Sequence, residues 1–151
     1  MPACIPIEFF PKTNIMSAMT VVVRNTRSAR IERTSEGIVI TRVLPNVQQS
    51  IDDAVENVSA AAEACAGKRA PIIVDLREAM TLDAETRHYY SGKKLTDFFC
   101  SLALLVPIGA FGKMMGNLYL RVANPGIPSR LFDSETDAIQ WSARHLNIDG
   151  G

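Results

Sequence analysis

The sequence has few of the residues that build metal sites or disulfide frameworks. It holds 3 cysteines and 2 histidines among 151 residues. Cys4, Cys65 and Cys100 are scattered and form no C-x-x-C pair, so a structural zinc site is not expected. The odd number of cysteines fits a reducing, cytoplasmic setting. Cys65 and Cys100 lie among apolar residues, which predicts that both are small buried side chains.

The sequence also lacks net charge and long apolar runs. Its 16 basic and 16 acidic residues cancel, so the chain has no electrostatic signature of binding to nucleic acid or to an acidic membrane. No segment approaches the roughly 18 apolar residues of a membrane span. We therefore expect a cytoplasmic protein that binds no nucleic acid and spans no membrane. A net charge near zero also favours self-association.

Motifs of common enzymes and cofactor sites are missing as well. There is no G-x-S-x-G and no H-E-x-x-H. The glycine-rich stretch 109–117, GAFGKMMGN, has neither dinucleotide-binding nor P-loop spacing, and Lys113 is not followed by the Ser or Thr that would hold Mg²⁺. Gly112 and Gly116 more simply allow a tight turn and a close backbone approach. We expect no cofactor and no metal.

The length and the hydrophobic content of 47% are enough for one domain with a buried core. Residues 1–19 are interrupted by Pro2, Pro6 and Pro11 and resemble no signal peptide. They are predicted to form an irregular N-terminal extension, and residues 20–151 are predicted to form the domain.

Segments rich in Val, Ile and Thr predict three early strands, at 20–25, 28–34 and 37–44. Gly37 suits the turn between the last two, which predicts a β-hairpin. The unbroken apolar runs 71–76 and 100–107 are typical of strands buried on both faces in a parallel sheet. A short strand is expected at 129–132.

The clearest helix is expected over 50–67, where Ser50 and Asp53 fit a capping box and Gly67 fits the end of the helix. Its expected apolar stripe consists of Ile51, Val55, Val58, Ala62 and Cys65. Further helices are expected over 83–90, 112–123 and 134–146. The order of these elements predicts an α/β fold, with a mixed sheet covered by about four helices and an N-terminal β-hairpin.

Two carboxylates flank the loop that follows the first buried strand. Asp75 ends the strand and Asp83 precedes a helix. With His88 they could perform acid–base chemistry, provided that their environments separate the two aspartate pKa values. The simpler interpretation is that Asp75 binds loop amides and Asp83 caps the helix.

The stretch VDLREAMTLDAETR, residues 74–87, resembles the STAS domain, the fold of anti-sigma factor antagonists. In that family a buried strand ends in Asp, and an Asp-Ser motif opens a helix whose first Ser is phosphorylated. Here Asp75 and Asp83 match the two aspartates, whereas Ala84 stands at the place of the phosphoserine. Glu85 and Thr86 replace the small residues that follow.

The resemblance extends over roughly residues 28–142 to a STAS-like family of uncharacterised bacterial proteins with the SpoIIAA-like fold. It implies a non-catalytic regulatory or scaffold module that binds an unknown protein partner. The expected contact surface consists of Asp75, Asp83, Ala84, Glu85, Thr86 and Arg87. The alternative is a carrier of a small ligand, a nucleotide or a lipid, in a pocket beside the sheet that would be lined by Phe111, Met114 and Met115.

A homodimer is expected from the charge balance and from two groups of aromatic residues. One group is Phe9 and Phe10 in the extension. The other is the region from Tyr89 to Phe99. The alternative is that Phe98 and Phe99 simply lead into the next core strand.

Overall fold

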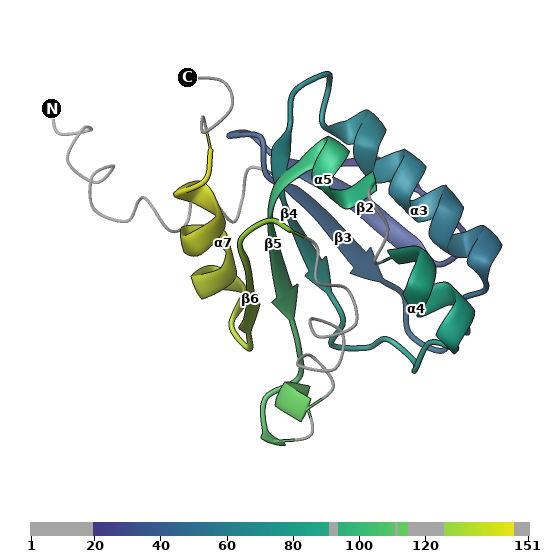
Figure 1. Ribbon diagram of the computed structural model, residues 1–151. Helices are drawn as coiled ribbons and strands as arrows, with labels where there is room; N and C mark the ends of the chain where they lie inside the picture. Colours follow the sequence, from purple (N-terminus) through teal and green to yellow (C-terminus); the bar gives the residue numbers. More distant parts are fainter. Residues whose placement is uncertain (1–19, 91–93, 111, 115–125, 147–151) are drawn as a thin grey trace, which may run out of the picture.

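The computed structural model describes residues 20–90, 94–110, 112–114 and 126–146 (Figure 1). Within these ranges, six strands form one sheet in chain order. The strands are β1 (Thr20–Asn25), β2 (Ala29–Thr34), β3 (Val39–Val43), β4 (Ala70–Asp75), β5 (Phe99–Leu105) and β6 (Ser129–Phe132). The helices are α3 (Ile51–Ala64), α4 (Ala84–Tyr90), α5 (Lys94–Phe98) and α7 (Glu135–Ala143). The expected α/β fold is confirmed. The extension at 1–19 and most of the helix expected at 112–123 lie outside the described residues.

The sheet is mixed because its two halves run differently. Strands β1, β2 and β3 are antiparallel neighbours, whereas β3, β4, β5 and β6 are parallel. The expected hairpin is formed by β2 and β3, and β1 extends it. At its turn Gly37 has a φ of 106° and donates its N–H to the Thr34 carbonyl oxygen, 3.0 Å away. Glycine tolerates this backbone conformation without steric cost.

The two unbroken apolar runs form β4 and β5, which pair in parallel inside the sheet, as expected. All residues of β5 are buried. Both strands are covered on both faces, and this explains why neither alternates between polar and apolar residues.

Helix α3 begins as the sequence predicts. The Ser50 hydroxyl accepts from the Asp53 N–H, and the Asp53 carboxylate accepts from the Ser50 N–H at 2.8 Å. The expected stripe is only partly right, because Val55 is 42% exposed. The buried side is instead formed largely by small and polar residues, namely Asp53, Ala54, Asn57, Val58, Ala60, Ala61 and Ala64.

The helices divide between the two faces of the sheet (Figure 1). Helices α3, α4 and α5 cover one face, which we call the α3 face, and α7 covers the other, the α7 face. Because side chains alternate along β3, Val39, Thr41 and Val43 belong to the α3 face and Ile40 and Arg42 to the α7 face. The domain therefore has two separate apolar cores.

Candidate functional site

The loop that opens α4 has the shape expected of a helix cap. The Asp83 carboxylate accepts the Thr86 N–H at 2.8 Å. This hydrogen bond holds the pKa of Asp83 below its ordinary value. Ala84 and Glu85 are exposed, whereas Thr86 is fully buried. Arg87 donates to the Leu82 carbonyl oxygen at 2.6 Å. Ala84, directly after the capping Asp83, thus faces solvent and has no hydroxyl.

Asp75 belongs to a different set of contacts. Arg77 donates to both of its carboxylate oxygens, at 2.9 and 2.8 Å, and Arg42 lies 3.1 Å from one of them. Arg42 also binds Glu32 at 3.0 Å and Glu135, in the first turn of α7, at 2.8 Å. These residues form an ion-pair network on the α7 face that joins β2, β3, β4 and α7. Arg42 and Arg77 are its centre. Arg77 lies two residues after Asp75, whereas no local spacing relates Arg42 to Asp75 or Glu135.

The network lowers the pKa values of Asp75 and Glu135. Burial alone would raise the pKa of Asp75, but the hydrogen bonds and charge of Arg77, with the charge of Arg42, hold it below the ordinary value. Hydrogen bonds from Arg42 likewise lower the pKa of Glu135 despite its burial. The pKa values of Asp75 and Asp83 are therefore shifted in the same direction, so the two residues are not separated into an acid and a base.

Three large apolar side chains are exposed at one edge of the sheet. Met80 lies in the loop after β4, and Ile108 and Met114 lie after β5. Their exposed fractions are 44%, 83% and 61%. Because β4 and β5 are parallel, both loops leave the same edge, and α4 begins from the first of them. We call Met80, Ile108 and Met114 the edge patch. Phe111 and Met115, the other two expected pocket residues, lie outside the described residues.

Gly112 has a structural role in the second loop. A Cβ atom at this position would lie 2.0 Å from the Pro107 carbonyl oxygen. The close backbone approach expected for Gly112 is therefore confirmed.

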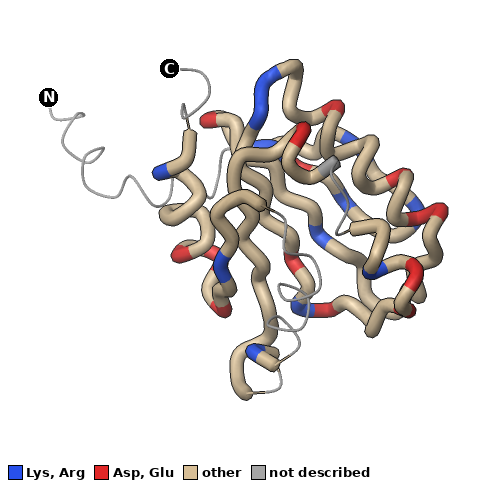
Figure 2. Tube along the Cα trace, in the orientation of Figure 1, with Lys and Arg blue, Asp and Glu red and all other residues tan. Residues whose placement is uncertain are grey.

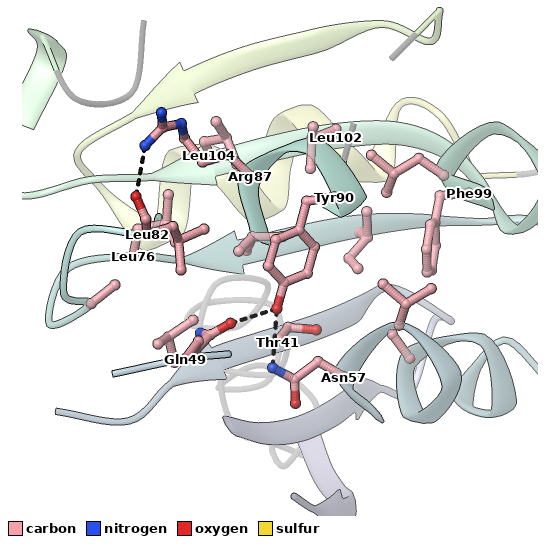
Figure 3. Close-up of a pocket in the computed structure, with 17 residues that line it drawn as sticks. Thr41, Gln49, Asn57, Leu76, Leu82, Arg87, Tyr90, Phe99, Leu102 and Leu104 are labelled. Atoms are coloured by element: carbon pink, nitrogen blue, oxygen red, sulfur yellow. Dashed lines mark hydrogen bonds between the residues drawn. The ribbon is translucent and has the colours of Figure 1, made fainter. Parts of the chain in front are cut away.

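A cavity of about 100 Å³ lies between the α3 face and helices α3, α4 and α5 (Figure 3). Its lining is almost entirely apolar and includes Ala61, Val74, Leu102 and Phe99. Polar side chains stand along one wall. There the Tyr90 hydroxyl donates to Gln49 at 2.6 Å and accepts from Asn57 at 3.2 Å. The expected aromatic cluster from Tyr89 to Phe99 is thus divided, since Tyr90 and Phe99 line the cavity while Phe98 is 38% exposed.

A second hollow, of about 380 Å³, lies beside β6 and α7. Phe132 and Trp141 are in its wall, with ring centroids 5.6 Å apart. Its charged lining is mixed and consists of Lys113, Arg130, Arg144, Asp133 and Asp137. Elsewhere basic and acidic positions are interspersed over the described fold (Figure 2).

Comparison with known proteins places the chain in a family. Residues 31–146 match the Domain of unknown function (DUF7793). The chain belongs to the DUF7793 family. The match covers β3 to α7 and begins inside β2. It names no STAS-like family. No curated protein shows significant similarity to the chain.

One solved structure is similar to the chain, the crystal structure of a protein with unknown function from Arthrobacter sp. FB24 at 2.20 Å resolution. The two are 23% identical, and the similarity covers 75% of this chain and 97% of that one. The TM-score is 0.29, which supports no conclusion about this DUF7793 member. In the part of this chain that the structure describes, no helix is both long enough and apolar enough to span a membrane.

Proposed function

We propose that this DUF7793 protein is a non-catalytic, STAS-like regulatory or scaffold module of the cytoplasm that binds a protein partner through the edge patch and the start of α4. The observation that carries the proposal is the exposure of three large apolar side chains on one edge of the sheet. The loops that carry these side chains leave the same end of the parallel strands, and exposed apolar surface is a feature of protein interaction sites.

The start of α4 supports a contact that needs no phosphate. Ala84 offers no oxygen at the place of the phosphoserine, and the buried Thr86 is out of reach of a kinase. Incubation with a serine kinase of the anti-sigma type should leave the mass of the protein unchanged. Phosphate on the exposed Thr81 would contradict a permanently unmodified surface, because a phosphate near a helix N-terminus is electrostatically favoured.

Photo-crosslinking in cells that express the protein natively tests the contact. A crosslinking residue replaces Ile108 in one variant and the exposed Glu36, in the β2–β3 turn at the opposite edge, in the control. Position 108 should give one discrete adduct, and Met80→Asp should remove it. Equal adducts from positions 108 and 36, or none from position 108, would contradict the proposal.

The hollow beside α7 favours a second candidate, a carrier of a nucleotide. Its volume lies within the usual range of ligand sites, roughly 300–1,000 Å³, and its aromatic rings and basic side chains match a base and a phosphate. The charged lining suits a nucleotide better than a lipid. Trp141 is the single tryptophan, so its fluorescence reports on this hollow alone. Saturable quenching by AMP that Arg130→Gln weakens would support the carrier, and no quenching at millimolar AMP would contradict it.

A homodimer remains part of the proposal, now with strand β1 as a further candidate contact. β1 is an edge strand, and Val21, Val22 and Val23 are 63%, 42% and 42% exposed. Unpaired edge strands can add a second copy of the same strand. Light scattering at micromolar concentration should give twice the monomer mass of 16.5 kDa. A wild-type protein of monomer mass would contradict the dimer. If β1 is the contact, the Val22→Lys variant should be a monomer.

A further inference from the structure

Among the described residues, a buried polar atom without a hydrogen-bond partner lines the cavity on the α3 face. The Thr41 side chain lines it, only 6% of the residue is exposed, and its Oγ1 atom has no hydrogen-bond partner in the described structure. A buried hydroxyl without a partner costs about 1–3 kcal/mol. The Tyr90 hydroxyl in the same cavity bonds to Gln49 and Asn57 and not to Thr41 (Figure 3).

The rest of the lining is suited to an apolar molecule. Val74, Leu102 and Leu104 come from the two buried parallel strands, and Ala61 comes from α3. Empty apolar cavities of about 150 Å³ remain dry and bind benzene or xenon. The cavity here, about 100 Å³, is of the same order. It is too small for a nucleotide or a lipid, whose sites usually occupy roughly 300 Å³ or more.

We propose that this cavity is a binding site for a small, neutral, largely apolar molecule of about one ring that carries a single hydroxyl or carbonyl group, held by a hydrogen bond to Thr41. The ring lies against Val74, Leu102 and Ala61. The polar group supplies the partner that the Thr41 hydroxyl otherwise lacks. The site is independent of the edge patch, so it stands whether or not that patch binds a protein.

The cavity lies next to α4, so a bound ligand would contact residues of this helix. Leu82, Arg87 and Tyr90, which lie in α4 or directly before it, line the same space. An occupied cavity therefore adds contacts beneath α4 and should slow amide hydrogen exchange in that helix. A ligand that orders α4 would act on the surface around Ala84 without any covalent modification.

Phenol and benzene are matched probes, since they differ by one hydroxyl. Methyl NMR of the full-length protein, with Val and Leu methyl groups labelled, gives the affinity for each probe. Both should bind saturably and show contacts with the Val74 and Leu102 methyl groups, and phenol should bind more tightly. Thr41→Val keeps the shape and removes the hydroxyl. It should weaken phenol about fivefold, the value of one hydrogen bond, and leave benzene within about twofold of the wild type.

Ala61→Leu is the control for the location, because the larger side chain fills the cavity. It should abolish binding of both probes while the other methyl signals stay in place. If that variant does not fold, the probe-to-methyl contacts in the wild type locate the site instead. Binding of neither probe at millimolar concentration would overturn the proposal, as would a Thr41→Val variant that binds phenol normally. Tighter binding of benzoate than of phenol would overturn the neutral ligand class.

Discussion

The two faces of the sheet bury their apolar residues against very different partners. On the α3 face, Val and Leu side chains of the strands meet a helix whose inner side is mostly alanine, and space remains between them. On the α7 face, Ile40, Ile73 and Leu105 pack against Ala138 and Ile139 of a short helix. Beside these apolar contacts, the α7 face has ion pairs between charged side chains, which link α7 to the strands. The comparison indicates that the α3 face leaves an apolar space beneath its helices, whereas ion pairs hold α7 and the hollow on its side is lined partly by charged residues.

The largest expected effect comes from the centre of the ion-pair network. Arg42→Met leaves Glu32, Asp75 and Glu135 without their shared partner, and Glu32 and Asp75 have side chains only 8% and 12% exposed. Removal of one member of a buried ion pair costs about 3 kcal/mol, so the free energy of unfolding in urea should fall by about this amount.

Arg30→Met is the matched control for Arg42. Arg30 also binds Glu32, at 3.1 Å, but its side chain is 52% exposed. Its loss should cost at most about 0.5 kcal/mol, as is usual for surface pairs. Equal losses for the two arginines would show that the network does not fix α7.

The next effect compares packing on the two faces by the same substitution. Ala138→Leu inserts a larger side chain into the α7 face, where Ala138 is fully buried, and should lower the free energy of unfolding by about 2 kcal/mol. Ala61→Leu places the same side chain in the cavity and should raise the free energy of unfolding by about 1 kcal/mol. Denaturant titration gives both values. If both substitutions changed the free energy of unfolding in the same direction, the proposed difference between the two faces would be contradicted.

A smaller effect concerns the start of α3, which Arg27 fixes to the loop after β1. Hydrogen bonds from Arg27 lower the pKa of Asp53 from 3.8 to about 2, although burial opposes the shift. Because the folded pKa is depressed, this stabilisation is fully present above about pH 4 and is lost as the pH falls towards 2. Arg27→Met should raise the Asp53 pKa towards 3.8 in a carboxyl NMR titration and make stability less sensitive to pH in that window. An unchanged Asp53 titration would contradict the role of Arg27.

The smallest effect on stability is expected at the edge patch. Ile108 is 83% exposed, so Ile108→Ser should change the free energy of unfolding by less than about 0.5 kcal/mol. Partner binding should nevertheless be lost, which separates recognition from folding. A loss of several kcal/mol would show instead that Ile108 packs within the domain.

Local sequence signals predicted most of the fold. A pattern of a few neighbouring residues was enough to predict strands β4 and β5, the Ser50 cap and the turn at Gly37. All of these features are found as expected. The buried side of α3 was harder, because Asp53 and Asn57 face inward. Their partners, Arg27 and Thr26, come from a distant loop.

The candidate site was predictable only in part. Asp83 as a cap and the exposure of Ala84 follow from the local pattern. Arg42 and Glu135 are separated by 93 residues, so no local spacing could reveal their pairing. The cavity is set by how much space alanine leaves opposite valine and leucine, which depends on the three-dimensional packing. Thr41 lies within the strand predicted at 37–44, and nothing in that local pattern distinguishes it from its neighbours.

Crystals of the wild-type protein exposed to pressurised xenon test the difference between the faces most directly. Xenon is apolar and enters cavities of this size. We predict one strong xenon peak on the α3 face, in contact with Ala61, Val74 and Leu102, and no peak between the sheet and α7. An empty or collapsed space beside Thr41, or a xenon atom under α7, would contradict the account.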